Sequence, residues 1–182
     1  YQDILAAYRA LAELKAAGKV MAIGVGAKNW KVIRRISADV PLDWVMIANS
    51  MTIKNHPEDL TAFMKSLENS GVPIINSAVF HSGFLTGSDY FDYRLIKPDS
   101  EENRQIFKWR GEFFKLCEAF HIKPAEACVR FALKAPGVKS IALNTSNPQR
   151  VRENIAMALA EIPGEFWEAM QHGGLIRGNF LV

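Results

Sequence analysis

The stretch VKSIALNTSNPQRVREN, residues Val138–Asn154, combines an apolar run, a loop of small and polar residues, and the start of a helical pattern. Three earlier stretches repeat this order: Lys19–Gly26, Leu42–Asn49 and Val72–Leu85. Alternation of this kind predicts a parallel sheet covered by helices. Four β/α units are half of an eight-unit barrel. We therefore predict that this α/β chain forms half of a closed barrel.

The expected elements follow from apolar periodicity and from the residues that cap helices. Strands are predicted at Val20–Val25, Trp44–Ile47, Val72–Asn76 and Val138–Leu143. Helices are predicted at Tyr1–Ala17, Trp30–Ser37 (capped by Asn29), Pro57–Asn69, Asp99–Phe120, Pro124–Ala135, Gln149–Ala160 (capped by Asn147-Pro148) and Glu165–Gln171. A long connection, Ser77–Pro98, carries several aromatic residues and suggests a lid or a wall of a binding site. An apolar tail follows Gly173-Gly174, and residues 1–182 are predicted to form a single domain.

Composition limits the possible functions. Apolar residues make up 49% of the 182 residues, which excludes a disordered chain. The net charge of +3 is small and not clustered, so no nucleic-acid role is expected. Cys117 and Cys128 have no metal-ligand spacing, so we expect buried free thiols and no metal site. The sequence has no secretory signal or membrane span, so a cytoplasmic location is expected.

The first residue, Tyr1, already lies within an amphipathic helical pattern. Its apolar positions are spaced for one helix face: Ile4, Leu5, Tyr8, Leu11 and Leu14. A protein rarely begins inside such a helix, so we expect that an N-terminal part precedes this sequence.

The segment Asn144–Asn154 is the strongest candidate for a binding site. It follows a strand and starts a helix, where backbone N–H groups and the hydroxyls of Thr145 and Ser146 would favour an anion. Arg150 and Arg152 add forked cationic donors that suit phosphate. In β/α barrels the last loops are common phosphate sites. Simple helix capping with solvated arginines explains the same residues equally well, so both interpretations, an anion site and a capped helix, stay open.

Two other features have weaker functional readings. Gly24-Val25-Gly26 follows a strand, but position 29 is Asn29 rather than the third glycine of a dinucleotide fingerprint. His81 lies after a strand and could act as a general acid. Nothing nearby in the sequence would orient it, so a histidine in a wall or on the surface is favoured.

Several stretches together resemble the aldo-keto reductase family. LKAAGKVMAIGV (Leu14–Val25) resembles the segment from helix 4 to strand 5 of that family, and FHSGFLTG (Phe80–Gly87) resembles its loop after strand 7. Asn144–Asn154, with Pro148, Arg150, Glu153 and Asn154 in place, resembles its cofactor-binding turn after strand 8. Asn76-Ser77-Ala78 and Gly24-Val25-Gly26 are similar to the branch of sugar dehydrogenases that act on L-fucose, D-threo-aldoses or L-galactose.

The resemblance implies a (β/α)8 TIM-barrel fold, with strands 5–8 and their helices in this chain. It implies an NAD(P)-dependent oxidoreductase that transfers a hydride between nicotinamide and a sugar lactol, aldehyde or ketone carbon. The family's proton-transfer residues lie in the first half of the barrel, so no catalytic residue is predicted here, and the isolated chain is expected to be inactive. Expected partners are NADP or NAD, a small carbonyl or sugar substrate, and either the N-terminal half of the barrel or a second copy.

The resemblance also implies a set of cofactor-binding residues. Those expected along the nicotinamide and pyrophosphate are Ser77, Ala78, Phe80, Gly83 and Leu85, and those expected around the adenosine are Asn144, Thr145, Arg150, Glu153 and Asn154. Asn144 stands where NADPH-selective members often have Lys, and Gly26-Ala27 where many have Ser-Asn, so the choice between NADP and NAD stays open. The alternatives from other functional classes are a non-catalytic half-barrel scaffold, a phosphate-binding domain, and a lyase or isomerase barrel that uses a phosphorylated substrate.

Overall fold

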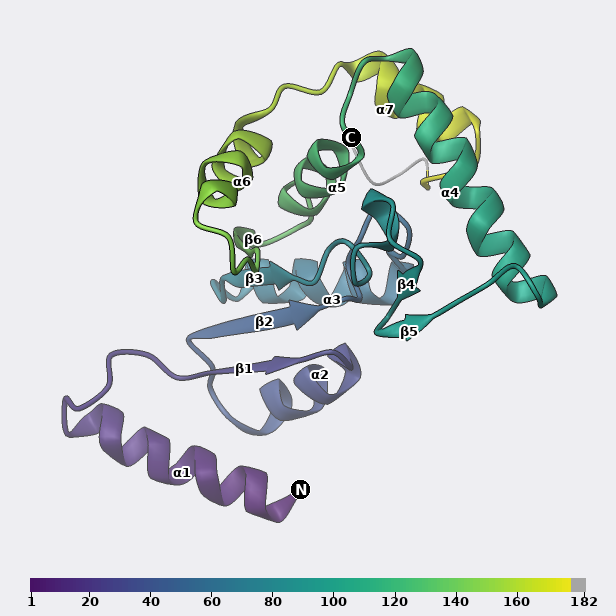
Figure 1. Ribbon diagram of the computed structural model, residues 1–182. Helices are drawn as coiled ribbons and strands as arrows, with labels where there is room; N and C mark the ends of the chain where they lie inside the picture. The colour runs from purple at the N-terminus through teal and green to yellow at the C-terminus, as the bar shows by residue number, and fades with distance from the viewer. Residues whose placement is uncertain (178–182) are drawn as a thin grey trace.

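The computed structural model describes residues 1–177, and the end of the apolar tail, residues 178–182, lies outside the described part. Its centre is a parallel sheet of four strands: β1 (Gly24–Ala27), β2 (Trp44–Ala48), β3 (Ile74–Ser77) and β6 (Val138–Ala142). The spatial order is β1-β2-β3-β6 (Figure 1). Consecutive units are therefore neighbours, as they are in a barrel, and β1 and β6 are the two ends of the open sheet.

Helices follow the strands in the order that the alternation predicts. They are α1 (Gln2–Ala16), α2 (Trp30–Asp39), α3 (Glu58–Asn69), α4 (Glu101–Ala119), α5 (Pro124–Leu133), α6 (Gln149–Leu159) and α7 (Gly164–His172). Asn29 caps α2 as expected, because its side chain accepts a hydrogen bond from the N–H of Lys31. The prediction of a partial β/α barrel is confirmed.

The core lies on the face of the sheet that the helices cover. Val45 and Ile47 of β2 and the paired Ile74 of β3 are completely buried there. Their alternate neighbours Trp44 and Met46 point to the other face and are only half-buried. The sheet thus has one sealed face and one partly open face. The latter would be the interior of a closed barrel.

The prediction for β1 is wrong at its start. Residues 20–23 precede the strand, because the first residue of β1 with a partner is Gly24, which pairs with Trp44. Asp43 contacts Ile23 instead: its carboxylate accepts the N–H of Ile23 at 2.8 Å, and its own N–H donates to the carbonyl of Ile23. Lys15 of α1 is ion-paired to the same carboxylate.

Two further features were not predicted. The connection 77–98 contains the 3-10 turn η1 (Phe84–Thr86) and a short antiparallel hairpin of β4 (Tyr90–Phe91) and β5 (Arg94–Leu95). The apolar face of α1 is buried only at Tyr8, whose hydroxyl donates to the carbonyl of Gly24 at 2.9 Å. Within residues 1–177, no helix combines the length and hydropathy needed to cross a membrane.

Gly24 is required by close packing between β1 and β2. A Cβ at this position would lie 2.3 Å from a ring carbon of Trp44 and 2.5 Å from its carbonyl oxygen. We predict that Gly24→Ala lowers the free energy of unfolding by about 1–3 kcal/mol, the usual cost of overpacking. Gly111 of α4 is the matched control, since a Cβ there meets nothing within 4 Å. Gly111→Ala should stabilise by about 0.5–1 kcal/mol. Urea denaturation measures both, and equal effects would contradict the packing argument.

Candidate functional site

A cavity opens where the carboxyl ends of β2, β3 and β6 meet. Its volume is about 440 Å³. Small side chains such as Ala48, Ser77 and Ala142 form its floor at the strand ends. Its lining residues are Ala48, Ser77, Ala78, Val79, Phe80, Ser82, Gly83, Tyr93, Ala142, Leu143 and Asn144. We call this the strand-end cavity.

A second cavity, of about 660 Å³, lies between the loop after β3 and the first turns of α5 and α6. We call this the α6 cavity. Its lining residues are Phe80, Gly83, Thr86, Lys123, Ala125, Glu126, Asn144, Thr145, Arg150, Glu153, Asn154, Ala156 and Met157. Phe80, Gly83 and Asn144 line both cavities. The two cavities are therefore adjacent along the ends of β3 and β6, and we call the pair the groove.

All of the sequence-predicted cofactor residues except Leu85 line this groove. Ser77 and Ala78 face the strand-end cavity, and Thr145, Arg150, Glu153 and Asn154 face the α6 cavity. The side chain of Leu85 is completely buried in the main core, because η1 turns it inward. It supports the loop from below and does not line either cavity.

The loop after β3 turns tightly over the groove. His81, Ser82 and Gly83 are successive residues with positive φ, which only glycine adopts without strain. The turn is held by hydrogen bonds from the N–H groups of Gly83 and Leu85 to the carbonyl of Phe80. A Cβ at Gly83 would lie 3.2 Å from the Cβ of Ser88, so glycine also keeps the loop compact.

The start of α6 contains the helix-capping contacts, which are one of the two interpretations that the sequence left open. Asn147 caps the helix by accepting the N–H of Gln149 at 3.0 Å, and Thr145 accepts the N–H of Asn147 at 3.1 Å. Capping thus occupies Asn147 and Thr145 but not Arg150. Across residues 1–177, Arg150 takes part in none of the ion pairs. Its cationic side chain lines the α6 cavity and is available to a ligand.

Lys123 and Glu126 line the α6 cavity as well and were missed in the sequence. They form an ion pair of 3.3 Å, and Glu126 also accepts the N–H of Lys123, which closes the first turn of α5. The sequence did indicate this helix start, because Pro124 and Glu126 occupy positions that favour the first turn of a helix and its capping. The cavity therefore has two cations and two carboxylates around its rim.

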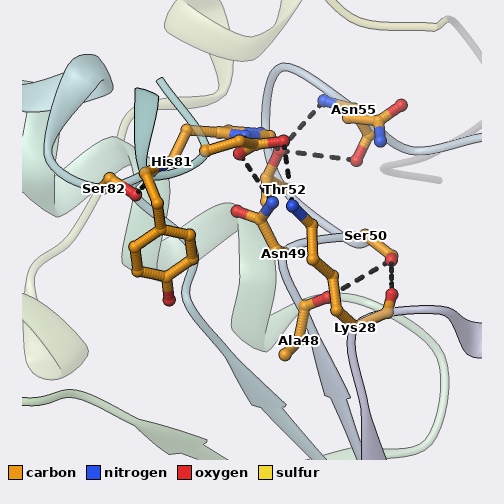
Figure 2. A network of polar contacts seen from close by, with 10 residues as sticks. Lys28, Ala48, Asn49, Ser50, Thr52, Asn55, His81 and Ser82 are labelled. Atoms are coloured by element: carbon orange, nitrogen blue, oxygen red, sulfur yellow. Dashed lines mark hydrogen bonds and ion pairs between the residues drawn. The ribbon is translucent and has the colours of Figure 1, made fainter. Parts of the chain in front are cut away.

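His81 is not a wall or surface histidine, because its ring is only 2% exposed. Its Nδ1 lies 2.7 Å from a carboxylate oxygen of Asp92, and its Nε2 lies 2.8 Å from the hydroxyl of Thr52 (Figure 2). Phe91 stacks on the ring at a centroid distance of 4.6 Å. The sequence reading that nothing orients His81 is wrong, since Asp92 orients it from the hairpin.

The order Thr52–His81–Asp92 has the hydrogen bonds of a nucleophile triad, but it is structural. Thr52 is completely buried, and its hydroxyl oxygen accepts the N–H of Asn55 at 3.0 Å. A substrate has no access to that hydroxyl. His81 likewise has both ring nitrogens occupied within the protein, so it supplies no proton to a ligand in the groove.

Asp92 is the centre of this polar network. Its carboxylate also accepts a hydrogen bond of 2.6 Å from the side-chain amide of Asn49 and lies 3.6 Å from the ammonium of Lys28. Burial alone raises the pKa of Asp92, but the hydrogen bonds from His81 and Asn49 and the charge of Lys28 outweigh it and lower the pKa to about 2. The carboxylate is therefore ionised at neutral pH.

The remaining titratable candidates are structural. His56 is buried, its Nδ1 contacts the carbonyl of Thr52, and burial lowers its pKa. Cys117 and Cys128 are buried free thiols, as predicted, and burial raises the pKa of Cys117 to about 12. Within residues 1–177, no three His, Cys, Asp or Glu residues gather in a way that could hold a metal ion.

The fold agrees with a comparison of the sequence against known families. The model described as "Aldo/keto reductase family" matches residues 1–172. The chain belongs to the aldo/keto reductase family. The resemblance noted in the sequence is thereby confirmed, and the parallel sheet of β1, β2, β3 and β6 corresponds to part of this family's barrel.

Two curated members of the family are similar over nearly the whole chain. Pyridoxal 4-dehydrogenase of Microbacterium luteolum is 28% identical over 173 residues, which cover 93% of this chain and 48% of that protein. D-threo-aldose 1-dehydrogenase of a Pseudomonas species is 26% identical over 178 residues, which cover 95% and 52%. The chain thus spans about half the length of the curated relatives it matches.

Solved structures show the same fold. The holo form of aldo-keto reductase AKR11C1 from Bacillus halodurans superposes with a TM-score of 0.69 at 15% identity, over 96% of this chain and 58% of that one. The thermostable aldo-keto reductase Tm1743, solved with the inhibitor epalrestat, gives a TM-score of 0.61 at 14% identity, over 90% and 52%.

The network around Asp92 has a predictable pH dependence. Its pKa in the folded state is about 2, below the ordinary 3.8, so its stabilising contribution is complete above pH 4 and is lost as the pH falls toward 2. We predict that Asp92→Asn lowers the free energy of unfolding at pH 7 and that the difference from wild type shrinks below pH 4. Urea denaturation between pH 7 and pH 3 measures it.

The matched control is Asp89→Asn, on the same loop. Asp89 is exposed and pairs with Arg110 at 3.4 Å, so its loss should change stability by less than about 1 kcal/mol. A difference between wild type and Asp92→Asn that stays constant from pH 7 to pH 3 would show that the Asp92 charge does not stabilise the fold.

Proposed function

We propose that this chain provides the dinucleotide-binding half of an NAD(P)-dependent oxidoreductase of the aldo-keto reductase type. The observation that carries the proposal is the groove, in which the strand-end cavity and the α6 cavity share three lining residues. It lies at the carboxyl ends of parallel strands, where β/α barrels place their active sites. An extended dinucleotide has two ends of different chemistry. The two cavities of the groove differ as well, because no charged residue lines the strand-end cavity, whereas two cations and two carboxylates line the α6 cavity.

The residues of the groove fit such a cofactor. The strand-end compartment has a floor of small side chains, including Ser77 and Ala78, and admits a flat ring and its ribose. The tight turn at Gly83 lets the backbone approach the pyrophosphate closely. Arg150, which has no ion-pair partner within the described part of the chain, offers its cation to a phosphate of the adenosine. Glu153 and Asn154, one turn further along α6, would contact the adenine.

The nicotinamide, when bound, supplies the hydride that passes to or from a carbonyl or lactol carbon. The contribution of this chain is to hold the dinucleotide and to fix its orientation. We assign no proton-transfer residue to the chain, because both nitrogens of His81 are occupied within the protein. In our proposal those residues come from the other half of a barrel.

The edges of the sheet support a partner for this half-barrel. Among residues 1–177, β1 and β6 each have a strand neighbour on one side only, and the face of the sheet that holds Trp44 and Met46 is only half-buried. Such edges and faces associate. We propose that an N-terminal half-barrel, or a second copy of this chain, covers them. A small sugar or other carbonyl compound is the proposed substrate, in line with the names of the two curated relatives.

Arg150 gives a direct test of the adenosine assignment. We predict that Arg150→Ala weakens NADP binding by about 1.5–3 kcal/mol, the value of a hydrogen bond to a charged group, and weakens NAD binding much less, because NAD lacks the 2′-phosphate. Asn144→Lys should strengthen NADP binding by adding a cation beside the same phosphate. Isothermal titration calorimetry of both cofactors with each variant measures these binding free energies.

Arg152→Ala is the matched control, since Arg152 lies on the same helix but lines neither cavity. It should leave both affinities unchanged. If Arg150→Ala weakened NAD and NADP equally, Arg150 would support the helix or the adenine, and its assignment to the phosphate would be wrong.

A further inference from the structure

Tyr93 is an unusual residue of the groove, because it lines the strand-end cavity and yet is 74% exposed. It comes from the β4–β5 hairpin, whereas the other lining residues belong to strand ends and to the loops that directly follow them. An exposed aromatic ring beside a cavity offers a flat apolar surface to a ligand. Its place over the cavity depends on how the hairpin is held.

The hairpin turn has a backbone conformation that needs support. Asp92 has a φ of 51° and Tyr93 a φ of 69°, which are left-handed values that residues with a side chain seldom adopt. Such conformations persist only where the surroundings fix them. Here the N–H of Tyr93 donates to the hydroxyl of Ser82 at 2.8 Å, and Ser82 itself is left-handed in the loop after β3. The hairpin turn and the loop after β3 therefore stabilise each other's left-handed backbone.

Asp92 connects this hairpin to the ends of three strands. Its carboxylate contacts Lys28, just after β1, and Asn49, directly after β2, as well as His81 in the loop after β3. Figure 2 shows Lys28, Asn49, Thr52 and His81 converging on this network. The hydrogen bonds of Asp92 with Asn49 and His81 are short, at 2.6 and 2.7 Å, and its side chain is only 21% exposed. The hairpin is therefore fixed to the sheet at the residue before Tyr93.

We propose that Asp92 is a positioning residue of the nucleotide groove, which holds Tyr93 over the strand-end cavity as the aromatic wall for a planar ring. The proposal rests on the proposed function, in which that ring is the nicotinamide. Tyr93 would contact the ligand, and Asp92 would act only through it. The ammonium of Lys28, 6.0 Å from the centre of the Tyr93 ring, further restricts where that ring lies.

The two compartments of the groove can be tested separately with two halves of the cofactor. Nicotinamide mononucleotide probes the strand-end cavity, and adenosine 2′,5′-bisphosphate probes the α6 cavity. Dissociation constants of both probes are measured by ligand-detected NMR on the purified full chain. The variants are Tyr93→Leu, Asp92→Ala, the double variant, and Asp92→Asn, which keeps an oxygen that accepts from His81 and Asn49.

The expected result is a selective loss. Tyr93→Leu and Asp92→Ala should each weaken nicotinamide mononucleotide by about three- to tenfold, the range of one aromatic contact. The double variant should be no weaker than the weaker single variant, because Asp92 acts through Tyr93. Asp92→Asn should stay within about twofold of wild type, even though it lowers stability. Adenosine 2′,5′-bisphosphate should bind all variants equally.

Tyr90→Leu is the control for a lost tyrosine, since Tyr90 is an exposed residue of the same hairpin that lines neither cavity. It should change neither affinity. Circular dichroism checks that each variant folds. Tyr93→Leu is a substitution at the surface, so it still tests the proposal if Asp92→Ala does not fold.

Other outcomes overturn the proposal. They are additive effects of the two single substitutions, an equal loss in Tyr90→Leu, or no binding of nicotinamide mononucleotide to wild type. If adenosine 2′,5′-bisphosphate still bound in that last case, the assignment of the α6 cavity would stand while the role of Tyr93 failed. If only nicotinamide mononucleotide bound, with the expected selectivity, the adenosine assignment would fail instead.

Discussion

Parallel pairing of β3 with β6 is the interaction on which the groove depends. Ser77, the last residue of β3, pairs with Ala142, the last residue of β6. The chain leaves both strands at the same level, so the loop that carries Phe80 and Gly83 lies beside the loop that carries Asn144. Because these three residues line both cavities, the pairing places the two cavities of the groove side by side. An antiparallel arrangement would send these loops to opposite edges of the sheet.

A second constraint acts above the sheet. The loop after β3 and the hairpin contain five residues with a side chain and a positive φ, and hydrogen bonds between the two segments join four of them: His81, Ser82, Asp92 and Tyr93. Their conformational cost is met by one ionised carboxylate, which receives hydrogen bonds from His81 and Asn49 inside a half-buried environment. Charged hydrogen bonds of this kind are among the stronger polar interactions in proteins. The network thus stabilises a loop whose backbone would not hold this shape alone.

The sequence was sufficient for the features that depend on local pattern. Apolar alternation predicted four strands and seven helices of residues 1–177, and glycine, proline and asparagine placed most helix ends. The position of nearly all predicted cofactor residues along one groove follows from the same logic, since parallel strands present their carboxyl ends together. The predicted start of β1 was wrong because a strand begins where it pairs with a neighbouring strand. Residues 20–23 come before that pairing, which begins with Gly24 and Trp44.

Features that depend on distant contacts were missed. The sequence did not predict the hydrogen-bond partners of His81, because Thr52 and Asp92 come from separate loops. Asp92 also lies in a hairpin that no apolar alternation predicts. Leu85 fell within a loop expected to touch the cofactor, but a 3-10 turn directs its side chain into the core. The position of Tyr93 beside the strand-end cavity depends on a left-handed backbone conformation that the local sequence does not specify.

The most direct test of the groove as a dinucleotide site is backbone-amide NMR of the purified chain during titration with NADP⁺. We predict that the amides of residues 78–83 and 144–154 shift together with one dissociation constant, while the amide signals of α1 and α3 do not shift. Shifts confined to residues 144–154 would mean that the chain binds only a phosphate at the start of α6. No shift in either segment would contradict the assignment of the groove to a nicotinamide dinucleotide.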